Sequence, residues 1–385
     1  MTAPTLREAV AVLDDLYDPR WAESWDAVGL VTGDLDQPVR RVLLAVDPAP
    51  VVIEEAAAWE ADLLVTHHPL LLRGVHGIAT TGPKGRAVTS LVRAGVALHV
   101  VHTNADVADP GVSDALAAAL GVIDTRPLRP AAQAATYKIV TFVPHADVDR
   151  VVDALAAAGA GRIGDYERCA WTVEGVGTFR ALQGARPAVG SVGTSEQVPE
   201  TRVEMVLPAQ ARTAAMAALR SAHPYEEPAV DLLVLAPGSV SRGTGRVGRL
   251  AAPTTLRRFA ETVERALPAT ATGPRVAGDR DSEVTTVAVC GGAGDDLFEE
   301  VRASGADVYV TADLRHHPAS EAREHGRPAL VDCAHWATEW PWLRDAERLL
   351  RAGLAARTGG GADSVETRVS DLVTDPWTPD PRSQH

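Results

Sequence analysis

The sequence predicts an α/β protein in which two related α/β halves form one core with mixed sheets, interrupted by an inserted α+β module. Two observations predict this fold. Residues 42–66 align without gaps onto residues 287–311, and each copy reads as a strand, a turn, a helix and a second strand, which is a βαβ unit. Between the copies, residues 134–236 combine separate β-like runs with two Ala-rich helical stretches. We therefore expect three segments, residues 1–132, 133–240 and 241–385.

The internal repeat has two readings. Any two βαβ units resemble one another, so the match could reflect shared local architecture alone. The other reading is that the two halves are related, so that the second strand of each copy ends at the same level, after Thr66 and after Thr311.

The two ends of the chain carry simpler signals. Thr5 followed three residues later by Glu8 predicts a capping box at the start of an amphipathic helix. Near the other end, residues 365–373 return to a β-like pattern, and we expect the polar, Pro-rich stretch after them to fray.

Composition narrows the class of protein. A net charge of −14 argues against a nucleic-acid partner, because such partners require a basic surface that neutralises phosphates. Three widely spaced cysteines form neither a disulfide framework nor CxxC pairs. The first residues do not form a signal peptide, and no apolar run is long enough to cross a bilayer. These features predict a cytoplasmic protein with no membrane partner.

The first candidate ligands follow a β-like apolar run. His67 and His68 stand directly after it, and Pro69 cannot continue the hydrogen-bond ladder of a sheet. Adjacent residues of a strand point to opposite faces, but a turn at Pro69 would bring both imidazoles to one side. Ligands of open α/β sheets gather at the carboxyl ends of strands. The pair is therefore a candidate metal site, although adjacent histidines are also found in loops without any such role.

A second strand end offers His102 and Asp106. An acidic residue beyond a strand is often only a helix N-cap. Here Asp109, followed by Pro110, already suits that position, which leaves Asp106 free to bind a metal.

A third apolar run, residues 329–331, is followed by Asp332, His335 and Glu339. Pro341 suits the first turn of a helix, so we expect Glu339 at the helix start and His335 in the turn before it. The alternative role for Glu339 is to complement the helix dipole.

Taken together, the three strand ends predict a two-metal site. The expected ligands are His67, His68, Asp106, His335 and Glu339. Imidazoles and carboxylates in this combination suit two divalent ions of zinc, manganese or iron, and one carboxylate could bridge them. His102 is expected to orient ligands or to transfer protons.

These motifs also carry a resemblance. The chain resembles the GTP cyclohydrolase I type 2 homologues, the NIF-three-like proteins, nearly from end to end. The motifs that match are WDAVGLVTGD (25–34), LLVTHHPLL (63–71), HTNADVADPGVSDALAAALG (102–121), TADLRHHPASEA (311–322) and VDCAHWATE (331–339). The resemblance implies the same five metal ligands.

The resemblance also implies a fold for the inserted module and a reaction for the protein. HPYEEPAVDL (223–232) and GTGRVGRL (243–250) resemble the longer family members, whose insert is similar to the ferredoxin-like fold of PII and CutA proteins. The resemblance implies a ring-shaped homohexamer and a nucleotide substrate. The reaction would be attack of metal-bound hydroxide on C8 of the GTP imidazole ring, with ring opening and formate release, and with His102 or Glu339 moving protons.

Other functions remain compatible with the sequence. A phosphoesterase or another nucleotide hydrolase would need the same metals. A non-catalytic metal-binding or regulatory scaffold is the main alternative, with the insert binding a small molecule or a protein.

Three weaker motifs each have a functional and a structural interpretation. CGGAG (290–294) could contact phosphate or form a tight turn. His223, Glu226 and Glu227 of HPYEEP (223–228) could bind a ligand, but a structured turn is favoured. His316 and His317 could line the metal site, but surface positions at a helix start are favoured.

Overall fold

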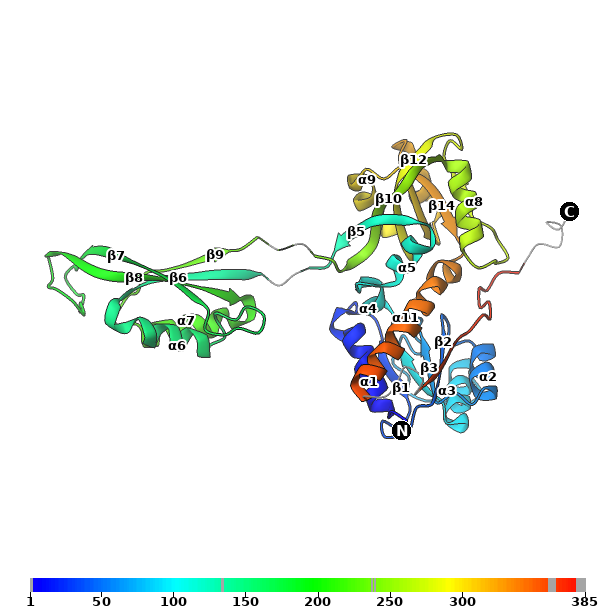
Figure 1. The fold of residues 1–385 in the computed structure, drawn as a ribbon, viewed down its shortest axis with the longest axis horizontal. Coiled ribbons are helices and arrows are strands. Elements are labelled where there is room, and N and C mark those ends of the chain that lie inside the picture. The colour runs from blue at the N-terminus through cyan, green and yellow to red at the C-terminus, as the bar shows by residue number, and fades with distance from the viewer. Residues whose placement is uncertain (1–2, 133–134, 237, 239, 359–364, 379–385) are drawn as a thin grey trace. The chain divides into compact units, whose positions relative to one another are not determined.

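The chain folds into two compact units (Figure 1). One consists of Met1–Ala131 and Ser241–His385 and is called the core unit below; the other, Ala132–Val240, is called the inserted unit. The computed structural model describes residues 3–132, 135–236, 238, 240–358 and 365–378. Within those ranges no helix combines the length and the apolar character that crossing a bilayer would require. The predicted α/β class with mixed sheets is confirmed.

The first sheet of the core unit is mainly parallel. Its strands, in spatial order, are β1 (Gly29–Thr32), β4 (Ala97–Val100), β3 (Leu63–Thr66), β2 (Arg41–Ala45) and β15 (Glu366–Val369). Only β1 is antiparallel to its neighbour. Three helices accompany the sheet: α1 (Leu6–Leu16), α2 (Pro50–Ala58) and α3 (Pro83–Ala94). Buried side chains of α2 and α3 pack on one face, and those of α1 belong to the cluster on the other.

The second sheet of the core unit is mixed. Its order is β11 (Arg275–Ala277), β14 (Ala329–Cys333), β13 (Val308–Ala312), β12 (Glu283–Ala293), β10 (Gly243–Thr255) and β5 (Val122–Pro130). β12, β13 and β14 are parallel, and the others run antiparallel to their neighbours. Its helices are α8 (Leu256–Ala266), α9 (Phe298–Ser304) and α10 (His316–Glu324). β5 precedes the insert in the chain and β15 follows β14, so each half contributes an edge strand to the sheet of the other.

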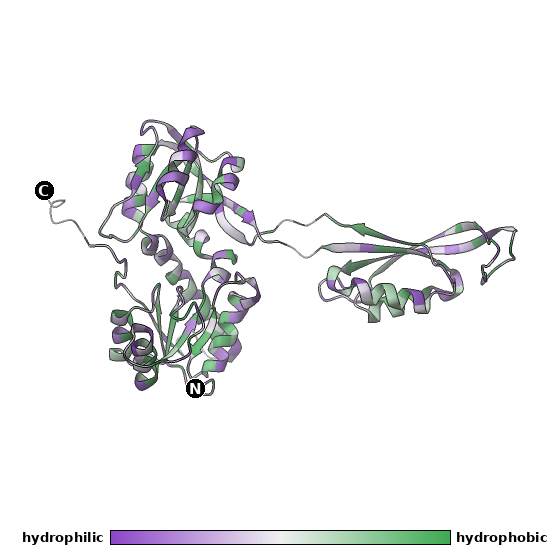
Figure 2. Cartoon of the chain, turned by 180° about the vertical axis from the view of Figure 1, so that it is seen from behind, coloured by the Kyte–Doolittle hydropathy of each residue, from purple (hydrophilic) through white to green (hydrophobic). Residues whose placement is uncertain are grey.

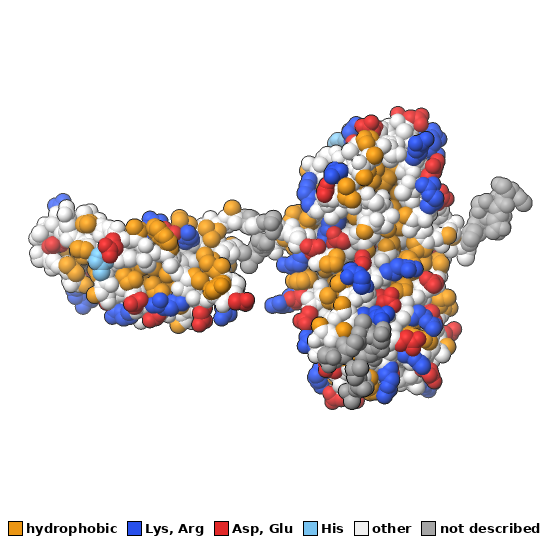
Figure 3. Space-filling model, viewed as in Figure 1, with side chains coloured by type: hydrophobic (Ala, Val, Ile, Leu, Met, Phe, Trp, Pro, Cys, Tyr) orange, Lys and Arg blue, Asp and Glu red, His pale blue; other side chains and the backbone are white. Residues whose placement is uncertain are grey.

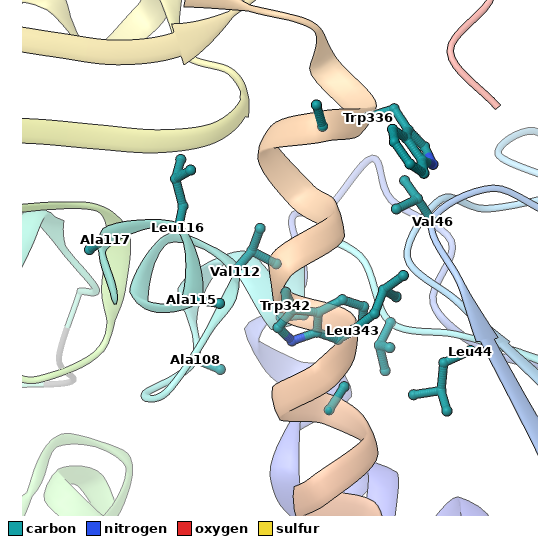
Figure 4. Close-up of a cluster of buried hydrophobic side chains, with 14 of the residues drawn as sticks. Leu44, Val46, Ala108, Val112, Ala115, Leu116, Ala117, Trp336, Trp342 and Leu343 are labelled. Atoms are coloured by element: carbon teal, nitrogen blue, oxygen red, sulfur yellow. The ribbon is translucent and has the colours of Figure 1, made fainter. Parts of the chain in front are cut away.

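One long helix joins the two sheets. α11 (His335–Thr358) packs against β2 and β15 of the first sheet and against β12 and β13 of the second. It also contacts α5 (Val112–Ala119), which follows the short helix α4 (Thr103–Val107). Figure 4 shows Trp342 and Leu343 of α11 between Val112 of α5 and Leu44 of β2, all of them buried in one cluster. In Figure 2 the strands of both sheets are mainly hydrophobic, whereas the surrounding helices carry many hydrophilic residues.

The internal repeat corresponds to two equivalent βαβ units. One is β2, α2 and β3, and the other is β12, α9 and β13, each with its two strands paired in parallel. The aligned Thr66 and Thr311 stand at or beside the carboxyl ends of β3 and β13. The predicted capping box is confirmed, since the Glu8 amide donates to Thr5 Oγ1 at 3.3 Å and the Thr5 amide to Glu8 Oε2 at 2.7 Å.

The inserted unit is one antiparallel sheet with two helices. Its elements are β6 (Thr136–Pro144), α6 (Val148–Ala157), β7 (Ala170–Arg180), β8 (Ser195–Pro208), α7 (Arg212–Ala222) and β9 (Val230–Val234). The strand order is β7-β8-β6-β9, the order of a βαββαβ module. Buried side chains of α6 and α7 pack with those of β6 and β8 in a separate core. The likeness to PII and CutA proteins stays a prediction.

A buried ion pair fixes the start of β10 to α5. The Arg246 side chain is 2% exposed, and it donates to both carboxylate oxygens of Asp114 at 2.6 Å. The same guanidinium donates to the carbonyls of Ala108, Gly243 and Gly245. We expect Asp114→Ala to lower the free energy of unfolding by about 3–5 kcal/mol, because it leaves the Arg246 charge buried without its anion. Urea denaturation followed by tryptophan fluorescence measures this loss.

The chain offers a control ion pair three residues further along β10. Arg249 pairs with Asp124 at 2.6 Å, but both side chains are more than half exposed. Asp124→Asn should therefore cost less than about 1 kcal/mol, since asparagine tolerates the φ of 53° at this position. Equal losses in the two variants would contradict the role given to the Arg246 ion pair.

Candidate metal centre

The structure brings together the three strand ends that the sequence singles out. His67 and His68 follow β3, and Asp106 lies in α4, which follows β4. His335 is the first residue of α11, and Glu339 lies one helical turn later. The expected helix start near Pro341 is wrong, because the amides of Ala337 and Thr338 already bond to the Ala334 carbonyl. Since residues four apart share a helix face, His335 and Glu339 point the same way.

Glu339 lies at the centre of the cluster. Its Oε1 is 3.4 Å from His67 Nε2 and 2.8 Å from His335 Nε2, and its Oε2 is 3.1 Å from His68 Nε2. Asp106 is farther out, with Oδ1 3.7 Å from His67 Nε2. Among the described residues, two groups could each hold a metal ion, namely His67, His68 and His102, and His68, His335 and Glu339. The Glu339 carboxylate thus faces three imidazoles at once.

Each imidazole of the cluster is held through its Nδ1 atom. Asp47 Oδ1 lies 2.7 Å from His68 Nδ1, Asp313 Oδ2 lies 2.7 Å from His335 Nδ1, and Asp26 Oδ1 lies 2.8 Å from His102 Nδ1. The carbonyl of Val101 lies 2.9 Å from His67 Nδ1. An oxygen acceptor at Nδ1 keeps the proton there and turns the Nε2 lone pair inward, as in protein metal sites. None of these three aspartates was predicted from the sequence to have a role in the site.

The carboxylates strongly favour positive charge at two of the histidines. Burial lowers the pKa of His68, but the charges of Glu339 and Asp47 outweigh burial and raise it to about 11. The pKa of His335 rises to about 10 through the same opposition of burial with Glu339 and Asp313. Burial raises the pKa of Glu339, yet the neighbouring imidazoles hold it well below its usual value. Glu339 is therefore an anion that attracts cations, whether protons on the histidines or metal ions.

The pKa shifts of His102 and Asp106 have the opposite sign and favour the neutral form of each side chain. Burial, and then the charge of His67, lower the pKa of His102 to about 4, so its ring is neutral at physiological pH. Burial raises the pKa of Asp106 to about 6. The His102 ring centroid lies 5.1 Å from that of His67 and 5.5 Å from that of His68. Its Nε2 lone pair therefore faces the same space as theirs.

The donor set fits divalent cations. His67 Nε2 is buried and has no hydrogen-bond partner among the described residues, and the same holds for Glu339 Oε2. Buried polar atoms are rarely left unpaired, so these two call for an electropositive partner. Gly292 keeps this space open: its φ is +69°, and a Cβ there would lie 2.5 Å from Glu339 Oε1 and 3.1 Å from His335 Nε2. Imidazole nitrogens and carboxylate oxygens are the ligands expected for zinc, manganese or iron.

A cavity of about 600 Å³ opens beside this cluster. His68 and His335 line it together with Trp336, Arg275 and the segment Thr374 to Trp377. The expectation that the chain frays after residue 373 is therefore wrong for Thr374 and Asp375, which are partly buried beside the cavity. The Thr374 hydroxyl donates to Asp47, which in turn holds His68. Residues 379–385 lie outside the described part of the chain.

The CGGAG motif forms the end of β12, where the chain passes close to α11. The Gly292 amide donates to Thr338 Oγ1 at 2.9 Å, which places this turn against the cluster of candidate ligands. Asp295 and Asp296 follow it directly and pair with Arg315 and Arg129 at 2.6 and 2.7 Å. The alternative phosphate contact stays a prediction.

In the two weaker histidine-containing motifs, the histidines have the structural interpretation favoured from the sequence. His316 and His317 are exposed at the start of α10. His223 is buried: its Nε2 lies 3.0 Å from the Phe142 carbonyl, and its Nδ1 accepts from the Tyr225 amide. Both nitrogens of His223 are thus engaged with backbone, as in the structured turn favoured for HPYEEP.

The Nδ1 partners give a direct prediction about metal affinity. We expect Asp47→Asn and Asp313→Asn each to weaken metal binding by about 10–100-fold, because the imidazole loses its orientation and basicity. Competition with a chromophoric chelator measures the affinity. Asp36→Asn is the control, since that side chain is exposed and pairs only with Arg7 among the described residues. Unchanged affinity in both site variants would count against a metal at His68 and His335.

The fold and the cluster define the class of protein: it is a mixed α/β protein with His and Glu groups that could hold a metal. A family model described as Duf34/NIF3 (NGG1p interacting factor 3) matches residues 4–376. The chain belongs to this family. The resemblance found in the sequence motifs is thereby confirmed.

Relatives and solved structures cover nearly the whole chain. A Mycobacterium tuberculosis protein named GTP cyclohydrolase 1 type 2 homolog is 51% identical over 376 residues, which is 97% of each chain. The Bacillus subtilis protein of the same name is 36% identical over 376 residues, covering 96% of this chain and 98% of that one. Among solved structures, a Bacillus cereus protein related to NIF3 is similar with a TM-score of 0.70 and 35% identity, covering 98% of this chain and 99% of that one. Staphylococcus aureus protein SA1388 has a TM-score of 0.78 at 27% identity, with the same coverage.

Proposed function

We propose that this chain is a dinuclear, divalent-metal-dependent hydrolase that acts on a nucleotide. The observation that carries the proposal is the convergence of five side chains, centred on Glu339, beside a cavity of about 600 Å³. That volume lies in the range of small-molecule sites.

The ligands divide naturally into two sets that share Glu339. His67 and Asp106 form one set, and His68 and His335 form the other. Glu339 Oε1 lies 3.4 Å from His67 Nε2 and 2.8 Å from His335 Nε2, so it faces one histidine of each set. These residues would hold two divalent ions, which would supply a water of lowered pKa and a positive charge that polarises the substrate.

His102 is the residue that we assign to proton transfer. Its neutral ring can accept the proton of an attacking water, and Asp26 at Nδ1 would stabilise the resulting imidazolium. Glu339, the other residue expected to move protons, is better suited as a shared ligand, because its pKa lies well below the usual value.

GTP is the substrate that the relatives' name suggests. The proposed reaction is hydrolytic opening of the imidazole ring at C8 with release of formate. The exposed Trp377 side chain lines the cavity and offers a flat apolar surface for a base. Arg275, whose guanidinium pairs with Asp332, also lines the cavity and would have to share its charge with a phosphate.

The decisive experiment incubates protein loaded separately with zinc, manganese or iron with GTP and measures formate, with generic phosphoesters assayed in parallel. We expect formate release that disappears in His67→Ala and in Glu339→Ala. The matched controls are His316→Ala and His317→Ala, which remove exposed histidines from a second adjacent pair. Turnover of phosphoesters alone would assign a phosphoesterase. Metal binding without turnover of any substrate would favour the non-catalytic scaffold.

We propose further that the protein acts in the cytoplasm as a homohexameric ring. The support is the family resemblance of its motifs. Light scattering coupled to gel filtration tests the assembly, and a monomer at micromolar concentration would contradict it.

A further inference from the structure

The inserted unit contains a cavity of its own, of about 630 Å³, which the metal chemistry does not use. It lies on the sheet face opposite the face that packs against α6 and α7. Val203, Met205 and Leu207 of β8 belong to the core beneath the helices, whereas the alternating Glu200 and Arg202 line the cavity. Hydrophobic side chains also reach the surface of this unit among charged ones, as Figure 3 shows.

Two glycines of β7 create the space. Gly175 pairs with Glu200 in the antiparallel ladder, and Gly177 pairs with Val198. A Cβ on Gly175 would meet nothing within 4 Å, so this position opens directly into the cavity. A Cβ on Gly177 would lie 2.1 Å from Glu200 Oε2, so the Glu200 carboxylate rests on that glycine. The sheet is hollowed here because β7 has no side chains at these two positions.

The HPYEEP turn builds one wall. His223, bonded on both ring nitrogens, fixes the turn and places Tyr225 and Glu226 beside the cavity. The Tyr225 ring lies 6.2 Å from that of Phe179, and Glu226 accepts from the Arg186 amide at 2.9 Å. The Tyr225 hydroxyl is buried beside the Glu200 carboxylate, and burial together with that negative charge raises the pKa of Tyr225.

The charges lining this largely apolar cavity are mostly negative. They comprise four carboxylates and one guanidinium: Glu174, Glu200, Glu226, Glu227 and Arg202. The Arg202 guanidinium is already paired with a carboxylate, since its Nε donates to Glu204 at 2.8 Å. Glu200 is only 8% exposed, and within the described part of the chain no Lys, Arg or His nitrogen lies within 4.0 Å of its carboxylate. A buried carboxylate without a cation is costly, so a bound cation would be strongly favoured here.

We propose that this cavity binds a small organic cation with an apolar, preferably aromatic, body and a protonated amine. The amine pairs with Glu200, the Tyr225 hydroxyl supplies a second polar contact, and the body lies against Val173 and Phe179. This site is independent of the metal centre and of its chemistry. It gives the HPYEEP motif a ligand-binding role that does not involve His223 as a ligand.

The test uses the full-length chain and calorimetric titration with phenethylamine and with 3-phenylpropionate, which share a ring and differ in charge. We expect the amine to bind at least about tenfold more tightly than the acid. Glu200→Gln should remove this preference, whereas Glu167→Gln, an exposed carboxylate of the same unit outside the cavity, should keep it.

Gly175→Val provides a second, independent arm. The added side chain fills open space in a strand, where Val is favoured, so the unit should stay folded and lose amine binding. Absent binding of phenethylamine by the unaltered protein, or equal binding of acid and amine, would overturn the proposal. It would also fail if Gly175→Val altered the molecular mass in solution, because this face would then be a contact between copies of the chain.

Discussion

Replacing Glu339 with glutamine is expected to empty both halves of the metal centre, whereas Asp106→Asn should remove only one ion. Glu339 Oε1 faces His67 and His335, and its Oε2 faces His68, so this carboxylate alone reaches both ligand sets. Asp106 approaches only His67 among the three imidazoles at ion-pair distance. The loss of affinity in Glu339→Gln should exceed the roughly 100-fold expected when an outer hydrogen-bond partner is removed.

The number of metal ions per chain is measured by elemental analysis of protein that has been purified without chelator and then dialysed. About two ions per chain are expected in the unaltered protein, about one in Asp106→Asn and close to none in Glu339→Gln. Asp345→Asn is the control, since it removes one negative charge from the same helix at an exposed ion pair with Arg348. Two ions retained in Glu339→Gln would show that Glu339 does not bridge them.

The cluster of candidate ligands could be predicted from the sequence because its signals are local. A Pro after two histidines and an acidic residue beyond the next strand both mark the carboxyl edge of one parallel sheet. The register of β2, β3 and β4 then places those residues together. The start of α11 was mispredicted because a Pro is common in a first turn, whereas here the Ala334 carbonyl already accepts two helical bonds before Pro341.

The residues that hold the imidazoles could not be predicted in the same way. Asp26 is 76 positions away from His102 in the chain, and no local pattern links an aspartate to an imidazole at that separation. The contact of Thr374 with Asp47 spans 327 positions and follows from the pairing of β15 with β2. Such contacts are fixed by tertiary packing, so they emerge only when the strand order is known.

Metal binding should release about two protons per chain, and the association constant should rise about 100-fold per pH unit between about pH 6 and pH 9. The reason lies in His68 and His335, whose pKa values near 11 and 10 keep both rings protonated in the metal-free protein across that range. A cation binds only the neutral imidazole, so each ring must first lose its proton, and a higher pH favours that loss. Above about pH 11 both rings are neutral and the dependence should flatten.

Calorimetric titration with zinc in buffers of different ionisation enthalpy counts the protons directly. Asp47→Asn and Asp313→Asn should each reduce the number released, because each takes away a carboxylate that raises the pKa of one ring. Zinc affinity that stays constant between about pH 6.5 and pH 8.5 would mean that His68 and His335 are not both ligands.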